Sequence, residues 1–210
     1  MAEITMVEAI RQAMVEEMRL DDAVVVLGED IGLKGGVFKA TAGLLEEFGA
    51  RRVLDTPIAE CVIAGAAIGA AMMGLRPIAE FQFADYMHPA HDQIVNQAAT
   101  IRWRTVGHFE VPVVFRAPFG GGVSGGIYHS QSVESLYCHI PGLQVVVPAT
   151  PRDAKGLLKS AIRSNDPVLF FEHKKSYRRY REEVPAEELI PIGVARLDRP
   201  GRDLSIFTYG

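Results

Sequence analysis

The residues that could do chemistry gather in one stretch of the chain, Val53 to Asp92. Within it, the carboxylate of Glu60 stands where a helix of small residues begins, and the aromatic residues Phe81, Phe83 and Tyr86 follow a second apolar run. Ligands of an open parallel sheet bind beyond the carboxyl ends of its strands, so both runs end at one crevice. The stretch therefore predicts a lone acid beside aromatic side chains.

The acid in this stretch has two interpretations. Glu60 is flanked by apolar neighbours that would remove its carboxyl group from water, namely Ile58, Ala59, Cys61 and Val62. Burial disfavours the charged form of a carboxyl group, and a neutral acid can donate a hydrogen bond to a ring nitrogen. The alternative is an ordinary acid in the first turn of a helix, where the helix dipole stabilises it.

A glycine-rich segment, residues 120–126, precedes His129. A histidine on such a loop can move protons near neutral pH, or it can make a structural hydrogen bond. The segment lacks the Gly-x-Gly-x-x-Gly and Gly-Lys-Ser/Thr fingerprints of nucleotide sites, and Ser130 lacks the turn context of a serine nucleophile. The chain therefore offers a crevice with an acid, aromatic rings and a histidine, but no phosphate-binding motif of its own.

Composition narrows the class of protein. The chain has 210 residues, of which 48% are hydrophobic, and a formal net charge of -4. These values indicate a globular domain and argue against a nucleic-acid-binding surface. Two cysteines make no disulfide framework or metal-ligand spacing, the N-terminus has no signal-peptide pattern, and the longest apolar segment is shorter than a membrane helix. We expect a soluble, cytoplasmic protein, with the basic run Lys174 to Arg181 on its surface.

Helical and strand-like patterns alternate along the chain. Thr5 is the expected N-cap of the first helix, and Pro151 opens the last one. Helices are predicted over 6–20, 44–48, 59–73, 88–102, 132–138 and 151–163, and strands over 23–27, 52–54, 77–83, 111–116, 143–147 and 167–172. The continuous apolar runs and the alternation predict an α/β fold with a doubly wound, mostly parallel sheet.

The domain prediction follows from a change in composition. Residues 1–183 form one domain, residues 184–202 are a linker rich in Pro, Glu and Gly, and residues 203–210 begin a new apolar strand. This last segment predicts a second domain that is truncated here. Within the first domain, the helix over 59–73 carries so many glycines and alanines that we expect either tight packing on its own sheet or close approach of a partner helix or cofactor.

Five segments resemble the beta subunit of the thiamine-diphosphate-dependent 2-oxo acid dehydrogenases. They are VLDTPIAE, AEFQFADY, GIYHSQS, PGLQVVVPATPRDAKGLLKSAI and DPVLFFEHKKSYR, and the resemblance extends from Ile4 to Gly210. It implies a transketolase-like pyrimidine-binding fold. It also implies an α2β2 heterotetramer in which the alpha subunit holds the diphosphate and Mg²⁺, and a lipoyl-bearing dihydrolipoyl acyltransferase core as a further partner.

The resemblance implies roles for four site residues. Glu60 matches the glutamate that hydrogen-bonds the aminopyrimidine ring of thiamine diphosphate, and Tyr86 matches an aromatic residue beside that ring, with Gln82 in the same pocket. His129 matches the histidine assigned to acyl transfer to the lipoyl group. The implied reaction is oxidative decarboxylation of a 2-oxo acid, with the organic chemistry supplied by the cofactor.

The same resemblance implies a potassium site built mainly from backbone carbonyl groups. The matching positions in this chain are Val113, Ala161, Ile162, Ser164 and Asp166. Ser164 stands where an acid is common in the family, which weakens the expectation of a bound cation.

The substrate and some alternatives stay open. The motifs resemble the branched-chain type, which acts on 2-oxoisovalerate, more than pyruvate dehydrogenase, and acetoin dehydrogenase is a further relative. One methylene group in an apolar pocket discriminates by only about 1–3 kcal/mol, so few residues could change the substrate. Another hypothesis is a transketolase-type or deoxyxylulose-phosphate-synthase-type carboligase, and a further one is a nonenzymatic structural or regulatory subunit. A nicotinamide-dependent oxidoreductase would also fit the sheet, but the chain lacks the glycine fingerprint of that class.

Overall fold

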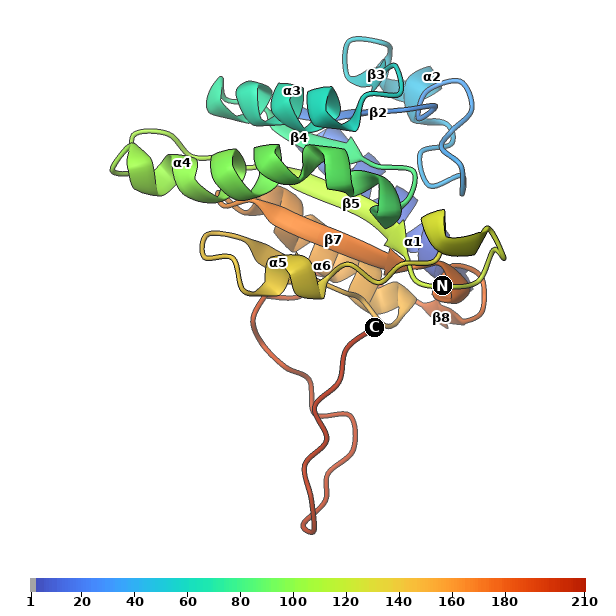
Figure 1. Ribbon diagram of the computed structural model, residues 1–210. Coiled ribbons are helices and arrows are strands. Elements are labelled where there is room, and N and C mark those ends of the chain that lie inside the picture. Colours follow the sequence, from blue (N-terminus) through green and yellow to red (C-terminus); the bar gives the residue numbers. More distant parts are fainter. Residues whose placement is uncertain (1–2) are drawn as a thin grey trace.

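The computed structural model describes residues 3–210, and its centre is a six-stranded parallel sheet (Figure 1). The strand order is β3-β2-β4-β5-β7-β6. The order reverses direction beside β2, as expected for a doubly wound sheet. The strands are β2 (Val24–Gly28), β3 (Val53–Asp55), β4 (Arg76–Glu80), β5 (Val114–Phe119), β6 (Gln144–Val146) and β7 (Val168–His173). The fold class predicted from the sequence is confirmed.

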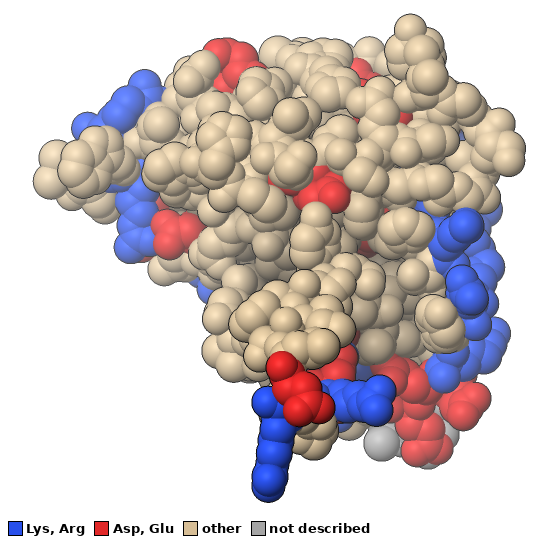
Figure 2. Space-filling model, turned by 60° about the horizontal axis from the view of Figure 1, so that its bottom comes forward, with Lys and Arg blue, Asp and Glu red and all other residues tan. Residues whose placement is uncertain are grey.

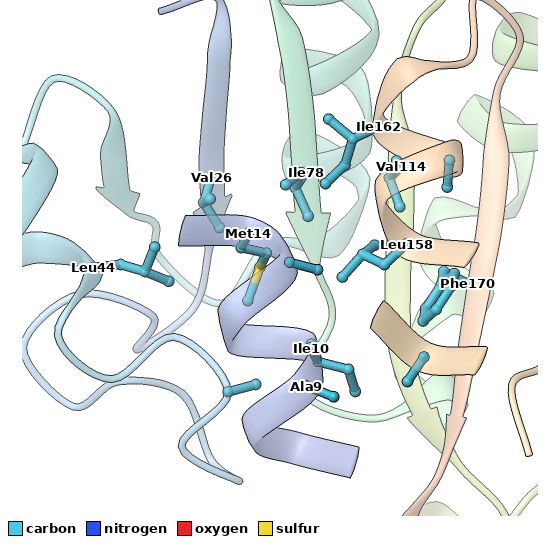
Figure 3. Packing of buried hydrophobic residues seen from close by; sticks show 14 of the residues in the cluster. Ala9, Ile10, Met14, Val26, Leu44, Ile78, Val114, Leu158, Ile162 and Phe170 are labelled. Atoms are coloured by element: carbon cyan, nitrogen blue, oxygen red, sulfur yellow. The ribbon is translucent and has the colours of Figure 1, made fainter. Parts of the chain in front are cut away.

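Helices cover both faces of the sheet and bury a core on each side. On one face lie α1 (Met6–Leu20) and α6 (Pro151–Arg163), which pack against each other and the sheet (Figure 3). On the other face lie α3 (Glu60–Met72) and the helical stretch that ends in α4 (Ala99–Arg104) (Figure 1). The shorter elements are α2 (Leu44–Phe48) and α5 (Ser135–Cys138).

Local capping explains where the two long helices of the first face begin. The Thr5 hydroxyl accepts a hydrogen bond from the Glu8 backbone N–H, and the Glu8 carboxylate accepts one from the Thr5 N–H at 2.7 Å. This is a capping box. At α6, the Thr150 side chain accepts from the Asp153 N–H at 3.1 Å, and Pro151 occupies the first helical position. Both predicted helix starts are confirmed.

The predicted helix over 88–102 is wrong in detail. The chain there forms the 3₁₀ helix η1 (Ala84–Ala90), the π-helix η2 (Gln93–Ala98) and then α4. Pro89 lies inside η1 and has no N–H to donate, so a regular α-helical ladder cannot run through it. The strand predicted over 111–116 is also shifted, because β5 begins at Val114 and continues to Phe119.

Two short strands were not predicted from the sequence. β1 (Glu3–Thr5) pairs antiparallel with β8 (Arg181–Glu183), far away in the chain. Between β7 and β8, the 3₁₀ helix η4 (Lys174–Ser176) begins the basic run. That run is not wholly a surface feature, because Lys174 and Tyr177 are buried while the other charged residues of the run are exposed.

The last residues form no helix or strand. Residues 184–192 still contact the body, and Ser160 on α6 donates a hydrogen bond to the Ile190 carbonyl at 2.6 Å. Beyond them the chain is exposed and projects from the sheet as an irregular loop (Figure 1). The strand predicted over 203–210 does not form, because a strand needs a partner for its backbone groups. The domain division at 183 stays a prediction. Among residues 3–210, no helix is long and apolar enough to cross a membrane.

Candidate functional site

The parallel strands bring their carboxyl ends, and the loops that follow, to one edge of the sheet. Glu29 follows β2, Gln82 follows β4, the glycine segment follows β5, and Lys174 follows β7. The predicted site residues Glu60, Gln82, Tyr86 and His129 all lie on segments that leave this edge. Parallel topology therefore gathers residues that are distant in sequence at one edge of the sheet, which is the position of the predicted crevice.

Glu60 is the first residue of α3, at the same edge of the sheet. Glu60 is half-buried. Its neighbours Ile58 and Val62 are 75% and 65% exposed, and Cys61 is exposed too. The expectation that apolar neighbours bury the carboxyl group is therefore wrong for this chain alone.

A second carboxylate, Glu29, faces the crevice and was missed by the sequence analysis. Burial raises the pKa of Glu29, and the negative charges of Asp30 and Glu60 raise it further. A hydrogen bond from the Gln82 side chain acts in the opposite direction. Glu29, Glu60 and Gln82 thus form one interacting polar group. The signal that could have found Glu29 is its position directly after a buried parallel strand.

Tyr86 and His129 form a hydrogen-bonded pair. The Tyr86 hydroxyl lies 2.7 Å from His129 Nε2, and His129 Nδ1 lies 3.0 Å from the Gly125 carbonyl oxygen. A carbonyl oxygen can only accept, so Nδ1 donates to it, and in the neutral ring Nε2 accepts from Tyr86. Burial, followed by the charges of Asp85, Glu29 and Glu60, raises the pKa of Tyr86. The tyrosine therefore stays a hydroxyl donor.

The loop that carries His129 is held from beneath by Asp85. One oxygen of this buried carboxylate accepts from the backbone N–H groups of Ser130 and Gln131, at 3.2 and 3.1 Å. The Phe83 ring packs edge-on against the imidazole of His129, with the ring centroids 4.7 Å apart. These contacts set the direction of the histidine before any ligand arrives.

A buried ion network lies below the crevice and joins three strands. Arg116 on β5 donates two hydrogen bonds to Glu172 on β7, at 2.6 and 2.7 Å, and one to Glu80 on β4. The Tyr177 hydroxyl also donates to Glu172. Burial raises the pKa of Glu80, although the Arg116 charge opposes this. Because Glu80 immediately precedes the residues that line the crevice, the network holds the base of the site.

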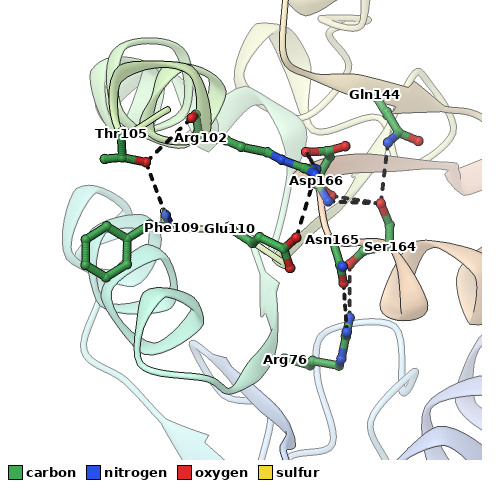
Figure 4. Close-up of polar contacts among 9 residues, drawn as sticks. All are labelled: Arg76, Arg102, Thr105, Phe109, Glu110, Gln144, Ser164, Asn165 and Asp166. Atoms are coloured by element: carbon green, nitrogen blue, oxygen red, sulfur yellow. Dashed lines mark hydrogen bonds and ion pairs between the residues drawn. The ribbon is translucent and has the colours of Figure 1, made fainter. Parts of the chain in front are cut away.

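The positions matched to a potassium site lie at the end of α6 and just before β5 and β7, at the opposite end of the sheet. Figure 4 shows two of them, Ser164 and Asp166. Each of the backbone carbonyl groups at these positions already accepts a hydrogen bond from this chain. Arg76 donates to those of Ile162 and Ser164, both at 3.0 Å. The Ser164 N–H donates to the Ala161 carbonyl, and the Val168 N–H donates to the Val113 carbonyl. The Ser164 hydroxyl donates to the Asp166 carbonyl. Within residues 3–210, no group of three or more His, Cys, Asp or Glu side chains could hold a metal ion.

The family model described as "Transketolase, pyrimidine binding domain" matches residues 2–179. The chain belongs to this family. The match covers the whole sheet and every site residue described above. The transketolase-like fold implied by the sequence resemblance is therefore confirmed.

Relatives of this pyrimidine-binding domain include subunits of 2-oxo acid dehydrogenases. The chain is 58% identical to 2-oxoisovalerate dehydrogenase subunit beta of Bacillus subtilis over 211 aligned residues, and 51% identical to pyruvate dehydrogenase E1 component subunit beta of the same organism. It is 50% identical to the pyruvate dehydrogenase subunit of Acholeplasma laidlawii. All of this chain is covered, but only 64–65% of each relative.

A solved structure shows the same fold in a more distant protein. A chain described as "Split gene transketolase, inactive beta4 tetramer" superposes with a TM-score of 0.70 at 22% sequence identity. The superposition covers 90% of this chain and 57% of the other. At this identity the likeness concerns the fold of the pyrimidine-binding domain alone.

Proposed function

We propose that this chain is the pyrimidine-binding part of the beta subunit of a thiamine-diphosphate-dependent 2-oxo acid dehydrogenase. The observation that carries the proposal is the meeting of Glu60, Gln82 and the Tyr86–His129 pair at one edge of a transketolase-type sheet. The names of the relatives support the reaction class.

The donor set fits an aminopyrimidine ring. The Glu60 carboxyl group can hydrogen-bond a ring nitrogen, and Tyr86 offers an aromatic face beside it. The buried Thr56 hydroxyl has no hydrogen-bond partner among the described residues, so one more polar group next to β3 is available. Thiamine diphosphate, when bound, supplies the carbanion chemistry that decarboxylation of a 2-oxo acid needs. Glu60 holds the ring nitrogen in the protonation state that this chemistry requires.

His129 serves the second half of the reaction, in which an acyl group passes to a lipoyl group on a dihydrolipoyl acyltransferase core. Its Nδ1–H is held by the Gly125 carbonyl, so Nε2 is the atom that faces the site. Tyr86 donates to that nitrogen and holds the ring in one orientation. When the acyl group passes to one sulfur of the lipoyl disulfide, the S–S bond breaks and is reduced, and a proton held at Nε2 can pass to the other sulfur.

An alpha subunit completes the site in an α2β2 assembly. We infer that this partner provides the diphosphate and Mg²⁺ ligands, because the described residues contain no diphosphate-binding motif and no group of three or more His, Cys, Asp or Glu side chains that could hold a metal ion. Exposed apolar residues lie near Glu60 (Ile58 and Val62) and at the other end of α3 (Met73), and they fit a surface that a partner covers. In Figure 2, charged side chains gather mainly at the margins of the face shown, and an acidic patch lies near its centre.

The test of the site is Glu60→Gln in the full-length beta subunit assembled with its alpha subunit. We expect loss of decarboxylation with the heterotetramer intact by light scattering. Glu46→Gln is the matched control, because Glu46 is exposed on α2, away from the crevice. Retained activity in Glu60→Gln would rule out the proposed role.

A branched-chain 2-oxo acid is the substrate we favour, because the identity to the 2-oxoisovalerate subunit is higher than that to the pyruvate subunits. Turnover of 2-oxoisovalerate, pyruvate and acetoin is compared in the assembled enzyme, with an artificial electron acceptor. Faster turnover of pyruvate or acetoin would keep the mechanism and change the substrate. Absence of turnover with all three would favour a nonenzymatic structural or regulatory subunit.

The isolated chain gives a second test of the shared site. We expect thiamine diphosphate to bind it weakly or not at all in calorimetry, because the diphosphate ligands are missing. Tight stoichiometric binding would contradict the division of labour between two subunits.

A further inference from the structure

The carbonyl groups of Ile162 and Ser164 at the end of α6 belong to the positions that the sequence resemblance matches to a potassium site, and they form the carbonyl cluster considered below. The last carbonyl groups of an α-helix have no partner within the helix, and they lie at the negative end of its dipole. Such a cluster attracts a cation, whether a metal ion or a side chain. In this chain the cation is Arg76, the first residue of β4.

Arg76 is held by several groups at once. One terminal nitrogen, Nη1, donates to the carbonyl oxygens of Ile162 and Ser164, both at 3.0 Å. The other, Nη2, donates to Asn165 Oδ1 at 2.9 Å (Figure 4). The third nitrogen, Nε, lies 3.8 Å from the carboxylate of Asp21. The planar guanidinium thus joins the end of α6 to the start of β4 and the turn before β2.

The other groups of the cluster are also engaged. Ser164 is uncharged, so it does not supply the negative charge that an acid at this position would bring. Its hydroxyl donates to the Asp166 carbonyl and accepts from the Asp166 N–H, both at 3.1 Å. The Asp166 carboxylate is paired with Arg102 at 2.6 Å. No carboxylate of this cluster is left to balance a second cation.

We propose that the Arg76 guanidinium takes the place of a monovalent cation at this cluster, so that this protein is stabilised here without potassium. A metal ion bound by the same two carbonyl oxygens would lie beside the guanidinium, and two like charges at that distance repel each other strongly. The proposal does not depend on the proposed activity, because its test measures thermal unfolding.

The experiment compares the unfolding midpoint of the full-length protein in potassium, sodium and choline chloride at equal ionic strength. We expect the same midpoint for the wild type in potassium and sodium. Arg76→Ala opens the carbonyl cluster, and we expect a midpoint lower by about 4 °C or more that potassium partly restores and sodium restores less. Arg76→Lys keeps one charge but not the planar donor set, so it should fall between the two.

Arg102→Ala is the matched control. It removes a neighbouring arginine and its pair with Asp166 but leaves the Ile162 and Ser164 carbonyls with Arg76. Its midpoint should not distinguish potassium from sodium. Selective stabilisation of the wild type by potassium would overturn the proposal. So would an Arg76→Ala variant that responds equally to both ions, or one as stable as the wild type. If the alanine variant does not fold, the wild type and Arg76→Lys still decide the question.

Discussion

Replacing Arg116 by methionine should destabilise the protein more than any surface substitution. Arg116 is 1% exposed, and its three hydrogen bonds neutralise the carboxylates of Glu80 and Glu172. Methionine fills a similar volume without charge, so the variant leaves two buried carboxyl groups without their cation. The destabilisation therefore comes from the unpaired buried charge of the carboxylates and not from a cavity.

The magnitude follows from this geometry. Breaking a buried pair by removing one partner costs about 3–5 kcal/mol. For a chain of this size we expect the unfolding midpoint to fall by about 6–20 °C. Arg19→Met is the matched control, because Arg19 and Glu47 form a pair at 2.6 Å with exposed fractions of 63% and 37%. An exposed pair is worth about 0–1 kcal/mol, so this control should change the midpoint little.

The loss should also depend on pH. Burial already raises the pKa of Glu80 while the Arg116 charge lowers it, so removing Arg116 raises the pKa further. A carboxyl group with a raised pKa in the folded state contributes its full stability below its unfolded pKa, about 4.3, and loses it as the pH rises through the folded value. Arg116→Met should therefore be closer to the wild type at about pH 5 than at about pH 8.

The assay is thermal unfolding by circular dichroism at both pH values. The triple variant Glu80→Gln, Arg116→Met, Glu172→Gln removes all three charges, so it should recover much of the lost stability. If Arg116→Met melts within error of Arg19→Met at both pH values, the reasoning is refuted. If the triple variant is no better than the single one, lost packing and not orphaned charge is responsible.

Three further predictions concern the loop that carries His129. Gly120 has φ +75 and an added Cβ would lie 2.6 Å from a β7 side chain, whereas Gly126 has φ +73 and open space, so Gly120→Ala should lower the unfolding midpoint by about 2–4 °C more than Gly126→Ala. Asp85→Ala removes the acceptor of two loop N–H groups, so amides of residues 120–131 should exchange hydrogen faster by mass spectrometry, and an unchanged rate would contradict this. Tyr86→Phe removes the donor to His129, so acyl transfer to a lipoyl domain should slow about fivefold, more than decarboxylation does, and equal slowing would argue against the pairing.

The order of elements could be predicted from the sequence because its signals are local. Thr5 and Pro151 define helix starts through groups within a few residues, and the buried apolar runs indicate a parallel sheet. The crevice followed from topology, since strand ends meet at one edge. The irregular helix around Pro89 and the β1–β8 pair were missed, the first because side-chain periodicity survives a change of helix type, the second because its partners are far apart in sequence.

Tertiary structure alone decided how the site residues are partnered. Tyr86 and His129 are 43 residues apart, and Arg76 is 86 residues from Ile162, so no local pattern relates the members of either pair. Glu60 had the expected position but not the expected burial, because its apolar neighbours Ile58 and Val62 are themselves exposed and cover nothing. The sequence by itself determined which groups are present and at which edge they gather. Hydrogen-bond partners, exposure and charge compensation came from contacts that only the folded chain makes.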